Sequence, residues 1–431
     1  MPHYQKLLAS VAIAALTVGA ATADPILAPA PNTGLDYSQL PNPQADILNQ
    51  QLQMGDVFSN LNVVVADTTD AVATSLAYGN TAHASQVNAT YSVSSSQVLG
   101  SEVRANNYVD VGQASGAVIA TTAAQANSVV ADTCCGTLDG SVVQQIDANP
   151  AGAPIAGYAD VNVQGAHDVN SGVVIGGNAA SYAVSNGTIN GYAGQVNYQS
   201  VRGENDIDIV YNSNTLTGIT TVTGNAVGTT AENGTVFLDT EQRQYGQEII
   251  ANVDIYAQSG ANAAGAATAS ANSVHATNTF GYAQASGYQE NTSFVQAESF
   301  VTLDNWAGYG SSTAYGVGNS VLLGNTGDSD TRLDYTQNNF EAGEVVTIAN
   351  FTGGAGGSVV TNATSIGNAI TSSVCASCGT GAGLYGSSQQ FNYANISAQT
   401  SVNTAYAAGG VNATAAAVGN SATYSSYSNG H

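Results

Sequence analysis

A short motif, Gly or Ala followed by Asn and a small residue, as in Gly318-Asn319-Ser320, recurs at eight nearly evenly spaced positions along the chain. Successive copies lie 47, 51, 47, 47, 47, 49 and 52 residues apart. Self-similarity at a fixed period of this size indicates a repeat architecture, in which each unit packs on its neighbours. The repeated asparagines are Asn80, Asn127, Asn178, Asn225, Asn272, Asn319, Asn368 and Asn420.

A glutamine keeps the same register in each unit. Its separation from the preceding asparagine is identical in the first five units, slightly longer after Asn319 and longer again after Asn368. Identical amides in successive turns can donate to one another, which satisfies buried polar groups and fixes the register. We therefore predict structural amide ladders, with ligand binding by these amides as the alternative. The glutamines are Gln97, Gln144, Gln195, Gln242, Gln289, Gln337 and Gln390.

Each unit opens with alternating apolar and polar residues, such as Val109-Asp110-Val111 and Ile207-Asp208-Ile209. This period of two is typical of strands, and no apolar stripe of helical period emerges. After Pro154 the chain has no proline, as expected where backbone donors enter a strand ladder. We predict an all-β fold, an elongated β-solenoid (β-helix) of about eight repeats of ~47 residues. Two turns of about 23 residues per repeat would give a rod of ~75 Å, and one larger turn would halve that length.

The segment that precedes residue 61 differs from the repeats. Residues 1–23 have the pattern of a signal peptide, with Lys6, an apolar run and a cleavage site between Ala23 and Asp24. The apolar run is too short to span a bilayer and no longer one follows, so we expect an exported protein with no direct membrane span.

Residues 24–60 are predicted to be a proline-rich linker with an N-terminal cap or a recognition tail. Its end, residues 44–61, is expected to hold one or two helical turns, with Asp46 as a helix cap. The repeat body is expected over residues 61–431.

The charge balance restricts the partners. Only 5 Lys and Arg stand against 29 Asp and Glu, which gives a formal net charge of −24. Such a surface repels phosphate backbones and anionic lipid headgroups, so we expect no nucleic-acid partner. A disordered chain is the alternative for so much Gly, Ser and Asn, but 43% hydrophobic residues with 22 Tyr favour a folded chain.

The four cysteines lie at matching positions of two long repeats. Cys134 follows Asn127 by seven residues, and Cys375 follows Asn368 by seven residues. The simplest expectation is one disulfide in each enlarged loop, Cys375 with Cys378 and, with more strain, Cys134 with Cys135.

Residues suited to catalysis are sparse. The histidines are scattered without metal-ligand spacing, and the densest carboxylate cluster is the turn at residues 327–334. We expect this turn to be solvated, with calcium binding as the alternative. We predict no catalytic residues, no metal and no cofactor. The aromatic residues are expected either to pack on strands or to form a sugar-contacting row: Tyr182, Tyr192, Tyr198, Tyr211, Tyr245, Tyr256, Tyr282, Tyr288, Tyr309, Tyr315 and Trp306.

The export signal, the proline-containing start, the acidic body and repeats such as Tyr315-Gly316-Val317-Gly318-Asn319-Ser320-Val321 resemble the HfaD family of holdfast anchoring proteins of stalked alphaproteobacteria. Asn80, Ala82 and Gln86 are also similar to the Asn-x-Ala-x-x-x-Gln pattern of curlin repeats. The resemblance implies a non-enzymatic cell-surface protein, associated with the outer membrane, that anchors the holdfast polysaccharide in adhesion and biofilm formation. It implies a curli-like companion protein and an outer-membrane lipoprotein exporter as partners.

Three other functions remain as alternatives. An amyloid-like, self-assembling surface fibre subunit would have uncapped strand edges. A polysaccharide-degrading β-helix enzyme would need two or three carboxylates converging in one cleft. An ice-binding solenoid would show a flat threonine array, of which only Thr220, Thr221 and Thr223 give a hint.

Overall fold

The chain is all-β over the residues that the computed structural model describes, 44–428 apart from 88, 150, 328 and 377–381. No helix occurs within these residues, which confirms the predicted fold class at this level. The predicted signal peptide, residues 1–23, and residues 24–43 of the predicted linker lie outside them. The strands are β1 (Gln44–Gln53), β2 (Val57–Thr68), β3 (Ala71–Val87), β4 (Thr90–Leu99), β5 (Val103–Ala114), β6 (Ala117–Cys134), β7 (Thr137–Ile146), β8 (Ile155–Ser185), β9 (Thr188–Asn197), β10 (Val201–Glu232), β11 (Thr235–Gln244), β12 (Glu248–Gly260), β13 (Asn262–Thr279), β14 (Ala283–Asn291), β15 (Phe294–Trp306), β16 (Tyr309–Thr326), β17 (Thr331–Asn339), β18 (Val345–Ala376), β19 (Leu384–Asn392) and β20 (Ile396–Ser428).

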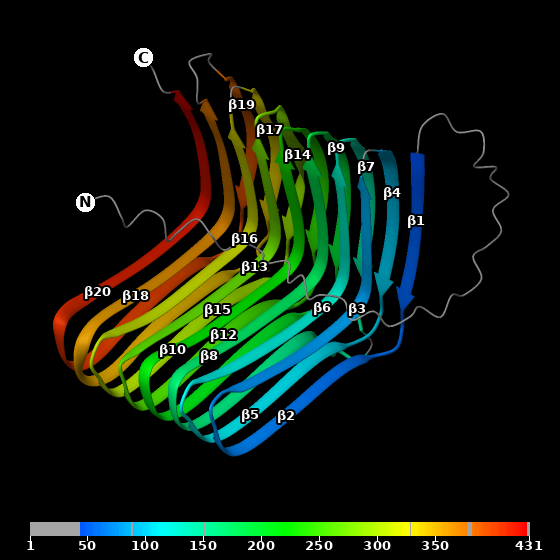
Figure 1. The fold of residues 1–431 in the computed structure, drawn as a ribbon. Helices are drawn as coiled ribbons and strands as arrows, with labels where there is room; N and C mark the ends of the chain where they lie inside the picture. Colours follow the sequence, from blue (N-terminus) through cyan, green and yellow to red (C-terminus); the bar gives the residue numbers. More distant parts are fainter. Residues whose placement is uncertain (1–43, 88, 150, 328, 377–381, 429–431) are drawn as a thin grey trace. The chain divides into compact units, whose positions relative to one another are not determined.

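Strands of successive repeats pair in parallel, side by side (Figure 1). One sheet has eight strands in the order β1-β4-β7-β9-β11-β14-β17-β19. The other has twelve strands and holds the remaining segments of each repeat. In both sheets the register is set by the repeat, so that Gln242 pairs with Gln195 on one side and Gln289 on the other.

Each repeat forms one coil, not two. Thr188 pairs with Thr235, at the same position of the next repeat, and no described strand pairs with a partner half a repeat away. The preferred prediction of two turns per repeat is therefore wrong. The physical reason is that a single coil holds three strand segments, for example β11, β12 and β13, so the whole repeat is needed to return to the starting edge. The eight strands of the smaller sheet span about 34 Å at the usual strand spacing.

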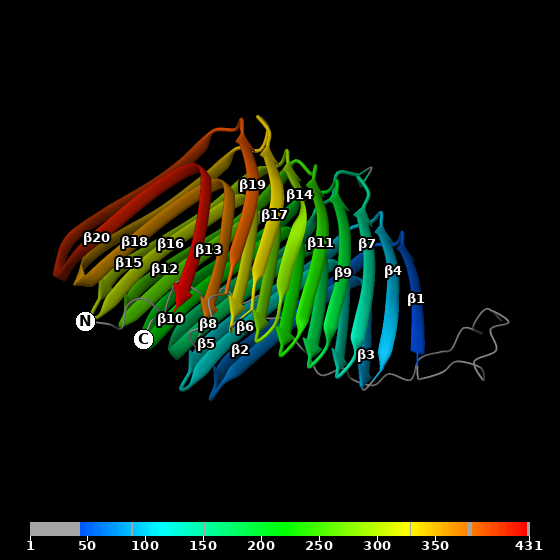
Figure 2. The same ribbon diagram turned by 90° about the horizontal axis from the view of Figure 1, so that it is seen from above.

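The core has two parts because the third segment of each coil bends (Figure 2). In β13, Ala267 of the first half belongs to the same buried cluster as Val253 of β12. Val274 of the second half belongs to a separate cluster with Ala285 of β14. Asn272 lies between the two halves, where four consecutive residues are buried and the inside-outside alternation changes phase.

The expected helical turns at residues 44–61 are absent. This segment forms β1 and the start of β2, and β1 pairs with β4 from Gln44 to Gln53. Ile47 and Gln51 alternate with the exposed Leu48 and Leu52 at period two, so their side chains face the interior of the first coil. Pairing with a complete neighbouring strand outweighs the weak local preference for a helix. Paired strands are thus present from Gln44, before the predicted boundary at residue 61.

Candidate functional site

The repeated asparagines form one continuous ladder at the bend of successive coils. The Nδ2 of each donates to the Oδ1 of the next, at 2.8–2.9 Å, from Asn80 to Asn420. The same Nδ2 groups also donate to backbone carbonyls; that of Asn272 donates to Glu290 O at 2.7 Å. Six of the eight side chains, from Asn127 to Asn368, are almost completely buried. These asparagines therefore hold the corner between two segments of each coil.

The repeated glutamines form a second ladder that runs in the opposite direction. Each Nε2 donates to the Oε1 of the preceding coil at 2.6–2.9 Å. Gln242 also donates to Ser273 O, directly beside the Asn272 corner. The ladder starts at Gln51, which sequence reasoning missed because no matching asparagine was found before Asn80.

A third, shorter amide column lies two residues after the glutamines. Asn291 donates to Asn339 at 2.9 Å, and Asn339 donates to Asn392 at 2.8 Å. Gln244 and Asn197 occupy the same register in the two preceding coils. Both amide atoms of Gln244 are buried without a hydrogen-bond partner in the described structure. In the sequence this column is an amide that recurs at the repeat period. Because Gln replaces Asn in one coil, no single residue type repeats, and the column is harder to recognise than the two long ladders.

The described cysteines do not form the expected vicinal disulfide. Cys134 and Cys135 are both free thiols. Cys135 has a positive φ of 68° at a tight turn, and joining adjacent cysteines there would add strain to an already unfavourable backbone. The Cys134 pKa is raised, first by its hydrogen bond to Cys135 and then by burial and the neighbouring thiol. Cys375 is exposed, and its predicted partner Cys378 lies outside the described residues.

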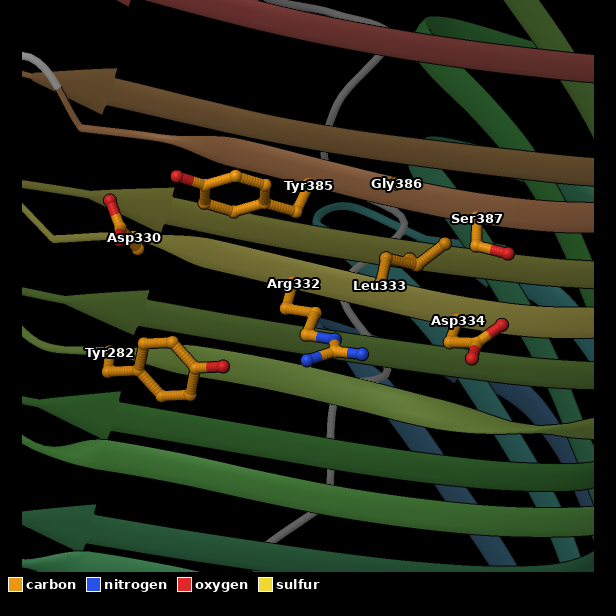
Figure 3. A pocket seen from close by; sticks show the side chains of 8 residues that line it. All are labelled: Tyr282, Asp330, Arg332, Leu333, Asp334, Tyr385, Gly386 and Ser387. Carbon is orange, nitrogen blue, oxygen red and sulfur yellow. The ribbon is translucent and has the colours of Figure 1, made fainter.

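The outer face of the eight-stranded sheet carries two grooves. The first has a volume of about 480 Å³ and lies over β17 and β19, beside Tyr282, which immediately precedes β14. Figure 3 shows Tyr282 and Tyr385 on either side of Arg332, with Asp334 and Ser387 towards one end of the groove. Arg332 and Asp334 come from the acidic turn singled out in the sequence, which continues into β17.

The second groove has a volume of about 370 Å³ and lies over β9, β11 and β14. Tyr192 and Phe237 supply its aromatic surface, and Asn190, Asp239 and Gln284 supply polar groups. Burial, followed by the charges of Glu241 and Asp239, raises the pKa of Tyr192, so its hydroxyl stays protonated and can donate a hydrogen bond.

The two grooves adjoin along the stacking direction. The ring centroids of Phe237, from the second groove, and Tyr282, from the first, are 5.5 Å apart at an angle of 46°. We call the two grooves together the aromatic strip. Of the aromatic residues singled out in the sequence, Tyr182 and Trp306 are buried in the core, whereas Tyr198, Tyr211 and Tyr309 are exposed elsewhere on the surface. Exposed rings beside hydroxyl, amide and carboxylate groups suit the faces and edges of sugars.

Within the described residues, no three His, Cys, Asp or Glu side chains come together as a group that could hold a metal ion. The same part of the chain contains no helix long and apolar enough to cross a membrane.

A comparison with family models shows which family the chain belongs to. The family model described as HfaD, holdfast attachment protein D, matches residues 65–343, a stretch that runs from β2 to the loop after β17. The chain belongs to the HfaD family. HfaD membership implies a role in holdfast attachment and a location at the cell surface or in the envelope. A search of curated proteins finds no match to this chain, and a search of solved structures finds none.

Proposed function

We propose that this protein is a non-enzymatic adhesion protein that fastens the holdfast polysaccharide to the outer membrane. The observation that carries the proposal is the HfaD match, which spans most of the paired coils and all three strand segments of the second groove. We further propose that these coils are those of a β-solenoid, with one coil per repeat.

A stack of this kind suits a load-bearing link. Each coil contacts only its neighbours, so the resistance to an applied force is shared by many backbone and amide hydrogen bonds. A repetitive surface also offers many weak contacts to a repetitive polymer, and their combined strength exceeds that of any one contact.

Attachment needs partners in the envelope. We propose export by way of the N-terminal signal, residence at the cell surface, and cooperation with a curli-like companion and an outer-membrane lipoprotein exporter. The acidic chain has little attraction for anionic lipid headgroups, which favours a protein partner over direct adsorption to the bilayer.

Deleting the gene in the bacterium that carries it tests the attachment role. We expect cells to shed holdfast into the medium, measured by microscopy of labelled holdfast on cells and on the surface they leave. Complementation with the full chain should restore retention. Unchanged retention in the deletion strain would contradict the proposal.

Self-assembly is a second candidate function, favoured by the open ends of the described coils. Within residues 44–428 nothing described pairs with the outer edge of β1 or of β20. Gln51 presents an amide nitrogen at one end of its ladder, and Gln390 presents an amide oxygen at the other. A second copy stacked head to tail would bring these complementary groups together.

Sedimentation of the purified chain tests this second candidate. Self-assembly predicts a particle size that grows with concentration and falls when Gln390→Arg places a charge at the open edge. A single species of monomer mass across the concentration range would exclude it.

A further inference from the structure

We propose that the aromatic strip binds one polysaccharide chain, laid across the strands, and that its carboxylates select a chain carrying free amino groups. This inference rests on the proposed attachment function and names the surface and the chemistry of its ligand.

The register of the strands places suitable groups in one straight row. Tyr192, Asp239, Ser286, Asp334 and Ser387 are paired residues on five consecutive strands, β9, β11, β14, β17 and β19. Their outward side chains are therefore about 4.8 Å apart along the stack. The two carboxylates lie on alternate strands, about 9.6 Å apart, which is close to the length of one disaccharide in an extended chain.

Two aromatic rings beside this row, those of Phe237 and Tyr385, are exposed to solvent. Phe237 is 41% exposed and Tyr385 is 61% exposed. Both belong to a second register row, two residues before the first one along each strand. Phe237 lies on β11 and Tyr385 lies on β19, three strands away. The flat rings of Phe237 and Tyr385 can each stack on the apolar face of a sugar ring in a polysaccharide that follows the row.

Charge complementarity identifies the kind of chain. Among the described residues, Asp239 accepts a single side-chain hydrogen bond, a long one of 3.2 Å from Ser286, which leaves carboxylate oxygen available. In the first groove the two carboxylates of Asp330 and Asp334 outnumber the one cation, Arg332. With a whole-chain charge of −24, a polymer bearing acid groups is repelled, and one bearing ammonium groups is attracted to the row.

Binding of matched sugar hexamers to the purified full chain tests the proposal. β-1,4-linked hexamers of glucosamine, glucose and mannuronate share their linkage and length and differ in charge. We expect the glucosamine hexamer to bind most tightly, the glucose hexamer about tenfold more weakly and the mannuronate hexamer not measurably, by calorimetry at low salt. Mannuronate binding as tight as glucosamine binding, or no binding of any hexamer, would overturn the proposal.

Two double variants separate stacking from charge. Phe237→Ala with Tyr385→Ala should weaken the glucose and glucosamine hexamers alike, by about tenfold or more. Asp239→Asn with Asp334→Asn should remove the preference for glucosamine and leave glucose binding within about twofold. Variants that bind as the unchanged protein does would refute the assignment of the strip.

A matched control uses the outer face of the other sheet. Asp208→Asn with Tyr211→Ala changes an exposed carboxylate and an exposed ring on β10. We expect this control to bind all hexamers as the unchanged protein does. The conservative pair Phe237→Tyr with Tyr385→Phe should retain binding, and urea unfolding of every variant checks that the coils remain folded.

The same variants in cells separate this inference from the attachment role. Holdfast shedding by both the deletion strain and the Phe237→Ala, Tyr385→Ala strain would support both proposals. Shedding by the deletion strain alone would leave the attachment role in place and overturn the strip as its contact surface.

Discussion

At the scale of single residues, the buried amide side chains of the ladders are hydrogen-bonded to the same type of amide in the neighbouring coils. Asn272 accepts from Asn225 and donates to Asn319, and its second donor hydrogen reaches a backbone carbonyl. A buried amide left without such partners costs about 1–3 kcal/mol. Gln244 is the residue where this pattern breaks, because its longer side chain lies in a column otherwise made of asparagines.

Gln244→Asn should repair the third column. The shortened side chain would stand between Asn197 and Asn291, its paired residues on β9 and β14, and could continue the hydrogen bonds that start at Asn291. We expect the free energy of unfolding to rise by about 1 kcal/mol, measured by urea denaturation. Gln242→Asn is the control: it should lower stability, because it breaks a ladder of glutamines. Equal effects of the two changes would contradict this explanation.

Asp206 should make stability depend on pH. Partial desolvation on the sheet surface, and then the charges of Asp208, Asp254 and Asp160, raise the pKa of this carboxyl to about 6. Glu204 and Arg202 lie on the same strand, and the Ile207 backbone N–H partly opposes the shift. An unfolded aspartate has a pKa near 3.9. The folded state therefore holds this proton more tightly, and the stabilisation is full below about pH 4 and lost as the pH rises through about 6.

The measurement is the urea midpoint of the unchanged protein and of Asp206→Asn between pH 4 and 7.5. We expect the variant to be the more stable at pH 7.5 and to lose part of the decline seen across this window. Parallel pH profiles for the two proteins would show that the carboxyl does not titrate there.

Sequence reasoning reached the two long ladders because each repeats one residue type at a nearly fixed period. The aromatic strip was out of reach for the opposite reason. Its register row reads Asn190, Phe237, Gln284, Arg332 and Tyr385, with no residue type repeated. Only the strand register shows that these side chains share one face. That register depends on how many coils each repeat forms, because the number of coils decides which residues are neighbours.

At the scale of elements, the joint between the third segment of one coil and the first segment of the next is a repeated tight turn. Cys135, Asn186, Asn233 and Phe280 each have a φ between 51° and 68° there, and each is followed by glycine. Asparagine tolerates this left-handed conformation, whereas a bulky side chain is strained in it. A Cβ on Gly234 would lie 2.8 Å from Gly187 O, so successive turns stack through their glycines.

Exchanging the residues at this turn should give effects of opposite sign. Phe280→Asn relieves the strain and removes an exposed ring, so we expect stability to rise by about 1 kcal/mol. Asn233→Phe should lower stability by a similar amount, since φ is 51° at that position. Urea midpoints of both variants check the prediction, and a change of the same sign in both would contradict it.

The N-terminal segment forms strands although its local sequence predicts helical turns. The sequence of residues 44–61 predicts one or two helical turns, with Asp46 as a helix cap. Their hydrogen-bond partners on β4 lie a full repeat further along the chain, as Gln97 does for Gln51. Local propensity contains no information about a neighbour so distant in sequence, and the pairing decides the conformation.

At the scale of the whole molecule, the repeat is the unit of length. Residues 235–281 make one complete coil, and their removal joins Gly234 to Tyr282, the residue that follows glycine at the same turn in the native chain. The coils on either side carry matching asparagines and glutamines, so the ladders can close across the join.

Deleting residues 235–281 should therefore give a folded, shorter protein, whereas deleting residues 235–257, about half a repeat, should not. Circular dichroism and the cooperativity of urea unfolding distinguish the two outcomes. If the half-repeat deletion folded as well as the full-repeat deletion, two coils per repeat would be the better description.

The opposed directions of the two long ladders have an electrostatic consequence. A single column of aligned amides would add its dipoles, as the peptide units of a helix do, and would leave opposite partial charges at its two ends. Here the asparagine donors point towards the C-terminal coils and the glutamine donors point towards the N-terminal coils. The moments of these two ladders subtract, so a further coil lengthens both of them without enlarging their combined axial dipole.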